Sequence, residues 1–92
     1  MTIWVVKEEF VPVTGAKARA DDELTAIIER LRSKFAENSF AANPTVSRLV
    51  VSAKVEAETY EGAEEWGRAV LFDAVTDELP DWRLDRLVAW SG

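Results

Sequence analysis

Polar and apolar positions alternate most clearly between Val46 and Thr59, where almost every second residue is apolar. A period of two is typical of a β-strand that has one buried face and one solvated face. The residues predicted to point inward are Leu49, Val51, Ala53, Val55 and Ala57. This segment is therefore predicted to be a long strand lying against a core.

A helix is predicted directly after this strand, from about Tyr60 to Leu79. Thr59 can cap its N-terminus, acidic residues occupy its first turn, and Pro80 stops it. Projected at about 100° per residue, one side of the helix gathers a set that is predicted to face the core. That set contains Ala63, Trp66, Gly67, Val70 and Ala74.

The same projection carries a second apolar set nearly to the opposite side of this helix. It contains Phe72, with Leu71, Val75 and Leu79 beside it. Phe72 could simply lie on Arg68 or under a loop. The alternative is a protein interface, because an exposed aromatic residue beside aliphatic residues is typical of a binding surface. Phe72, Val75 and Leu79 are therefore candidate interface residues.

The remaining elements follow from shorter patterns. Residues 2–13 are rich in β-branched and aromatic residues and are predicted to form the first strand. A helix is expected from Asp21 or Asp22 to near Asn38, with apolar residues on one face. A short edge strand is expected at 39–42, a turn at 43–45, and a last strand at about 82–90.

This order of elements, βαββαβ, is the ferredoxin-like pattern: an α+β two-layer sandwich in which two helices cover one face of an antiparallel sheet. The 92 residues fit one domain, 1–92. Periodicity predicts a core of Leu24, Ile27, Ile28, Leu31, Phe35, Leu49, Val51, Val55, Trp66 and Val70.

The first strand is apolar on both faces, and only one face can lie under the helices. One set contains Trp4, Val6 and Phe10, and the other contains Ile3, Val5 and Val11. The sequence leaves open which set is buried. The other set would join Val50, and Leu87 if it points the same way, in a patch on the outer face of the sheet. Trp4 and Val50 are therefore further candidate interface residues.

Composition excludes several kinds of chemistry. The chain has no cysteine and no histidine, so it lacks a thiolate nucleophile, Cys-based metal sites and the commonest general base. Its acidic clusters lack the spacing of a calcium-binding loop and are read as helix caps or solvated faces. No catalytic residue, metal site or cofactor is predicted.

The formal net charge is −6, and residues 61–79 contain six acidic residues against Arg68 alone. The acidic helix is read as a solvated face or as a docking surface for a basic partner. Nucleic-acid binding is not expected, since it depends on neutralising phosphates. No membrane-spanning run or signal peptide is seen, and a cytoplasmic location is the default expectation.

Two segments, Val55–Trp66 and Leu79–Leu84, carry a resemblance across roughly the C-terminal half of the chain. A strand, a capped acidic helix and a Trp-led last strand together resemble small uncharacterised ferredoxin-like α+β proteins of actinobacteria and their phages. The resemblance implies no known activity. It is consistent with a phage or bacterial accessory protein that binds a partner.

The function expected from the sequence is a non-enzymatic protein-interaction module that binds a protein partner or self-associates as a homodimer. The alternative is a small dimeric α+β-barrel protein of the monooxygenase-like or small-molecule-binding class. An enzyme or ligand binder needs an enclosed pocket with converging polar groups, whereas an interaction module needs only a surface.

Overall fold

Four antiparallel strands form one sheet in the order β2-β3-β1-β4, with the helices packed on one of its faces. The computed structural model describes residues 2–45 and 47–91. The elements are β1 (Thr2–Pro12), α1 (Asp21–Arg32), β2 (Phe40–Pro44), β3 (Leu49–Ala57), α2 (Tyr60–Trp66), the π-helical segment η1 (Gly67–Leu71), α3 (Phe72–Glu78) and β4 (Trp82–Ser91).

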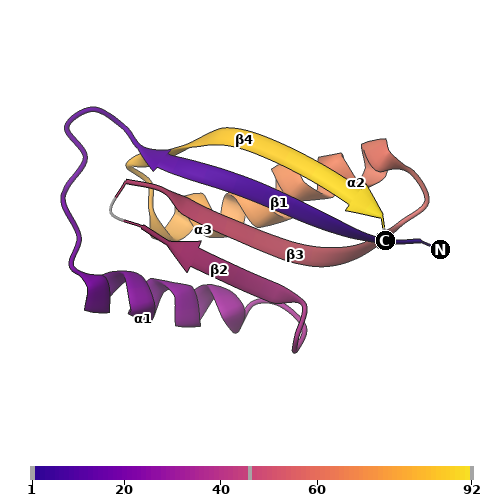
Figure 1. The fold of residues 1–92 in the computed structure, drawn as a ribbon, viewed down its shortest axis with the longest axis horizontal. Coiled ribbons are helices and arrows are strands. Elements are labelled where there is room, and N and C mark those ends of the chain that lie inside the picture. Colours follow the sequence, from indigo (N-terminus) through magenta and orange to yellow (C-terminus); the bar gives the residue numbers. More distant parts are fainter. Residues whose placement is uncertain (1, 46, 92) are drawn as a thin grey trace.

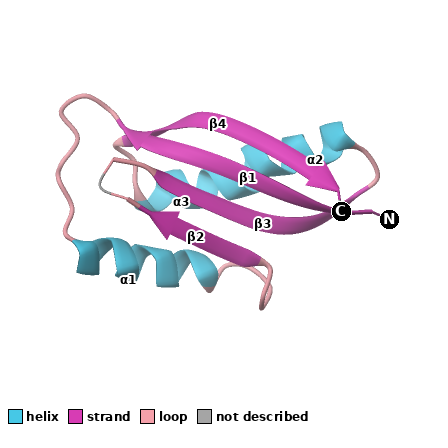
Figure 2. Ribbon diagram, in the orientation of Figure 1, coloured by secondary structure: helices cyan, strands magenta, loops and turns pink. Residues whose placement is uncertain are grey.

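This arrangement confirms the predicted ferredoxin-like α+β sandwich. In Figure 1, α1 lies beside the edge strand β2, and α2 and α3 run behind the other strands. Figure 2 shows α2 and α3 behind the strands of the sheet. No helix in the described part of the chain is long and apolar enough to cross a membrane.

The alternation of β3 sets the register of the sheet. Leu49, Val51 and Ala53 are buried toward the helices, whereas Ser52 and Lys54 point to the outer face. β1 pairs with β3 from Thr2↔Ala57 to Phe10↔Leu49, so the inward residues of both strands share one face. The predicted start at Val46 lies outside the described residues.

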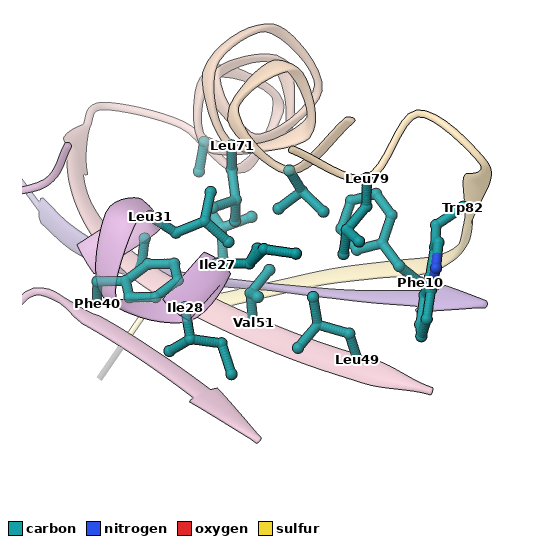
Figure 3. Packing of buried hydrophobic residues seen from close by; sticks show 14 residues of the cluster. Phe10, Ile27, Ile28, Leu31, Phe40, Leu49, Val51, Leu71, Leu79 and Trp82 are labelled. Carbon is teal, nitrogen blue, oxygen red and sulfur yellow. The ribbon is translucent and has the colours of Figure 1, made fainter. Parts of the chain in front are cut away.

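The core fills the space between this inward face and the helices, as Figure 3 shows for its larger members. Ile27, Ile28 and Leu31 of α1 meet Val51 and Leu49 of β3 there. An ion pair at the surface joins α1 and α3: Arg30 Nη2 lies 2.9 Å from Glu78 Oε1. The guanidinium hydrogen bond lowers the pKa of the Glu78 carboxyl.

The first helix ends earlier than the prediction near Asn38. α1 stops at Arg32, and the next amides bond three residues back, Lys34 N to Leu31 O and Phe35 N to Arg32 O. Phe35 therefore lies beyond the helix, where its ring stacks on Phe40 at 5.2 Å. Asn38 does adopt the left-handed conformation, with φ of 63°.

Two other boundaries differ from the sequence prediction. Neither Asp21 nor Asp22 caps α1: the N-cap position is Ala20, and no side chain caps the helix there. β2 includes Asn43 and Pro44, which had been expected to form a turn. Thr59 does cap α2, because its hydroxyl accepts a 3.1 Å hydrogen bond from the Gly62 amide.

The second helical stretch runs from Tyr60 to Glu78 but is not α-helical throughout. Between α2 and α3, η1 widens the turn, and the Phe72 amide donates to the carbonyl of Gly67, five residues back. The buried residues along the stretch are four apart: Ala63, Gly67, Leu71, Val75 and Leu79. Val70, predicted for the core, is instead 43% exposed.

Candidate functional site

Three candidate interface residues on the second helix do not form an exposed surface. Val75 and Leu79 are fully buried in the core, so the prediction that they lie at an interface is wrong. Phe72 is half-buried, and its ring stacks on that of Phe10 with centroids 6.1 Å apart. The wide turn of η1 rotates this side of the helix toward the sheet.

The other two candidates lie on opposite faces of the sheet. Trp4 is half-buried on the helix-covered side, where its indole nitrogen donates to the Ala57 carbonyl at 3.1 Å. Its ring also meets the edge of Tyr60 at 6.0 Å. Val50 is half-buried on the outer face. The structure does not bring these two residues together.

The structure shows which face of β1 is buried under the helices. Val6 and Phe10 are fully buried under the helices, so Ile3, Val5 and Val11 lie on the outer face. Leu87 points inward and packs against the core, contrary to its tentative place in the outer patch.

An apolar strip crosses the outer face at one end of β1 and β4. It consists of Ile3, Val5, Val88 and Trp90. Val5 lies opposite Trp90, and Val88 lies opposite Lys7, so their side chains share this face. Ile3 and Trp90 are 46% and 45% exposed, which is high for such large apolar side chains.

An arginine cluster occupies the other end of the outer face. Arg48 Nη1 lies 3.1 Å from Asp85 Oδ2 and 3.5 Å from Glu9 Oε1. Arg83 and Arg86 add further ion pairs, to Asp85 at 3.5 Å and to Glu9 at 3.9 Å. A bulge in β4, opposite Glu9 and Phe10, leaves Asp85 outside the regular pairing with β1. The charges in this cluster therefore largely compensate one another.

The two layers of the molecule carry opposite charge. The outer sheet face has a formal charge of +2, although the whole chain carries −6. The rest of the chain therefore holds a formal −8, of which −7 lies on the helices and loops and −1 is counted for the buried Glu8. The charged residues of the outer face are Lys7, Glu9, Arg48, Lys54, Glu56, Arg83, Asp85 and Arg86.

A buried carboxyl group lies on the other face of β1, between Val6 and Phe10. Glu8 has no exposed surface, and neither of its carboxyl oxygens has a hydrogen-bond partner among the residues that the structure describes. Burial raises its pKa to about 8, while the nearby Arg68 guanidinium lowers the pKa by a smaller amount. Glu8 is therefore mostly protonated at neutral pH.

Gly67 places the backbone of η1 directly against this carboxyl. A Cβ atom at Gly67 would lie 2.7 Å from Val6 Cγ1, 3.0 Å from Glu8 Oε2 and 3.3 Å from Leu87 Cδ1. Only glycine permits so close an approach. π-Helical turns are rare, and they occur frequently at functional sites.

The sequence reasoning did not single out Glu8. Its position between the inward residues Val6 and Phe10 was the available signal, because a period of two places all three on one face.

Ligand-sized space is open to solvent. A groove of about 520 Å³ lies between the end of α1 and α3, lined by Lys34, Asp73, Ala74, Thr76 and Asp77. Lys34 Nζ and Asp77 Oδ2 are 3.7 Å apart there. Within residues 2–45 and 47–91, no group of three or more His, Cys, Asp or Glu residues is placed to hold a metal ion.

Comparisons with known proteins add no relative: no family model matches the chain, and no curated protein or solved structure gives a significant match.

Proposed function

We propose that this protein is an interaction module that self-associates through the outer face of its sheet. The observation that supports this proposal most strongly is the apolar strip of Ile3, Val5, Val88 and Trp90, which no helix covers. β1 and β4 thus present an uncovered apolar surface, and aromatic anchors such as Trp90 are enriched at the centres of protein interfaces.

Burial of this strip would contribute favourable free energy to association. Burial of apolar surface contributes about 25 cal/mol per Å², and a fully buried large side chain contributes about 1.5–3 kcal/mol. In the monomer, nearly half of the surface of Ile3 and of Trp90 is exposed to solvent. A second copy packed on both residues would recover part of this free energy and would offset some of the entropy lost on binding.

Charge distribution is compatible with a second copy as the partner. When two sheets pack by their outer faces, the strongly acidic helical layers point away from each other on opposite sides of the dimer. Repulsion between them is then screened over the thickness of two sheets, beyond the Debye length of roughly 8–10 Å. The outer face carries only a small net charge of its own.

The charged groups of the outer face are compatible with a two-fold contact. In such a contact the same patch meets itself, so a surface that holds both signs of charge can pair with its own copy. Lys54 and Glu56 are exposed two residues apart on β3, and the arginine cluster is internally paired. The interface therefore needs no partner of extreme charge.

The experiment is a concentration series by sedimentation velocity on the wild-type protein and two variants. Ile3→Glu introduces a carboxylate into the apolar strip, and Val70→Glu introduces the same group at an equally exposed aliphatic residue on the helical side. We expect the wild type and Val70→Glu to dimerise and Ile3→Glu to remain monomeric, with all three folded by circular dichroism.

Two results would contradict the proposal. One is a wild-type protein that stays monomeric at concentrations of several hundred micromolar, where even weak dimers would be populated. The other is a dimer that Val70→Glu disrupts while Ile3→Glu leaves it intact, because the contact would then involve the helices.

A further inference from the structure

Glu8 lies in surroundings that cannot solvate its ionised carboxylate. Both carboxyl oxygens are buried without a partner, the cross-strand neighbours on the same face are Val51 and Leu87, and Gly67 closes the space above. In such surroundings the neutral carboxyl costs much less free energy than the ionised one, which needs water or a cation.

The close approach of η1 means that water cannot reach the carboxyl while the helix is seated. A methyl group at Gly67 would lie 2.7 Å from Val6 Cγ1 and 3.0 Å from Glu8 Oε2, so the neighbouring atoms would have to shift. Hydration of an ionised Glu8 therefore requires the helix to move away from β1. Proton loss and helix seating are thus coupled by geometry.

The charged groups around Glu8 are few. The positive charge of Arg68 on η1 lowers the pKa of the Glu8 carboxyl. In the seated helix, Arg68 Nη1 lies 2.7 Å from Glu64 Oε1. The charged residues of α1 are exposed, and those of β3 and β4 point to the outer face. On β1, Lys7 and Glu9 also point outward. Arg68 is therefore the cation best placed to receive an ionised Glu8.

We propose that Glu8 is a proton-dependent latch: η1 stays packed against the sheet while Glu8 is protonated, and loss of the proton releases η1, so that the Arg68 guanidinium exchanges Glu64 for Glu8. In this reaction the Glu8 carboxyl gives one proton to solvent and accepts hydrogen bonds from water and from Arg68. No other group changes its charge. The inference does not depend on self-association.

The direction of the pH dependence follows from linkage. A carboxyl freed from burial ionises near the ordinary value of 4.5, whereas the seated one ionises at about 8. Between these values the open state has lost a proton that the closed state keeps. The opening equilibrium should therefore rise about tenfold per pH unit in this range and level off above it.

Hydrogen exchange by mass spectrometry tests this proposal on the full chain between pH 5 and 9, with correction for intrinsic exchange. In the wild type, protection of amides in residues 63–71 should fall with pH until it levels off, while β1 and β3 stay protected. Glu8→Gln, which cannot ionise, should show a flat profile. Glu9→Gln, the neighbouring carboxyl on the outer face, should behave like wild type.

Arg68→Gln supplies a second measurement at a surface position, so the test remains available if Glu8→Gln fails to fold. Removal of the nearby cation raises the pKa of the seated carboxyl, and the levelling-off should move to higher pH. The proposal is overturned if wild-type protection in 63–71 does not change with pH, if Glu9→Gln flattens the profile, or if protection falls equally throughout the sheet.

Discussion

The two faces of β1 reverse the usual distribution of polar and apolar side chains. On the helix-covered face, the fully buried Glu8 lies between Val6 and Phe10. On the open face, Ile3 is left 46% exposed, and Trp90 of the adjacent β4 is 45% exposed. An ionisable side chain is thus buried inside the molecule, while large apolar side chains are exposed on its surface.

This contrast shows where the sequence departs from the requirements of folding alone. Most positions agree with the fold at every level, and proteins tend to violate local rules at functional or strained sites. A partner can bury an exposed apolar strip. A buried carboxyl must instead keep its proton, or the helix must move so that water reaches it. The two faces therefore point to two different properties, association and proton-linked motion.

The largest expected effect comes from placing a second carboxyl on the covered face. Val51 is fully buried and lies directly opposite Glu8 in the sheet. Val51→Asp would bury another acid beside the first, at a cost of several kcal/mol, which approaches the whole stability of about 5–15 kcal/mol of a small domain. We expect this variant to be unfolded by circular dichroism.

The neighbouring residue provides the matched control. Ser52 lies on the outer face opposite Lys7, so Ser52→Asp should change the free energy of unfolding by about 0.5 kcal/mol or less. If the two variants proved equally stable in urea titrations, the assignment of the two faces would be wrong.

A smaller effect is expected where the helix meets Glu8. Gly67→Ala adds a methyl group that would lie 2.7 Å from Val6 Cγ1, so the helix or the strand must shift. Overpacking of this kind typically costs about 1–3 kcal/mol. Thermal and urea denaturation should therefore show a clear loss of stability.

Gly62→Ala is the corresponding control on the same helical stretch. A Cβ atom there would have Thr59 Oγ1 at 3.4 Å and Ala57 Cβ at 3.7 Å, which are ordinary contacts. The variant should gain up to about 1 kcal/mol, because alanine favours a helix over glycine. Equal stability of Gly67→Ala and wild type would mean that η1 does not lie against β1.

The sheet could be predicted well from the sequence because its signal is local. Alternation along β3 requires only the identity of each second residue, and Val51 and Leu49 are buried as predicted. The order of elements then restricts the topology to a few choices. Which face of β1 is covered was not predictable, since Val5 and Val6 are equally apolar and the answer depends on tertiary packing.

The second helix was less predictable because its turn is not uniform. At 100° per residue, buried residues four apart would drift by about 40° per step, or about 160° from Ala63 to Leu79. The extra residue in the π turn takes back about 100° of this drift. Without knowledge of η1, the projection assigned Val70 to the core and Val75 to the surface, and both assignments were wrong.

Spin labels, each introduced at one of two surface positions, perturb the protein least and test the central claim of self-association most directly. Within the described chain no native cysteine competes with an introduced one. Lys54→Cys places a label on the exposed part of the outer face, and Asp73→Cys places it on the exposed side of α3.

Pulsed electron paramagnetic resonance then measures the distance between labels in the dimer. Packed sheets lie about 10 Å apart, so the account predicts a short intermolecular distance for the label at position 54 and a much longer one at position 73. A short distance at position 73 with none at position 54 would contradict it, because the copies would then meet through their helices.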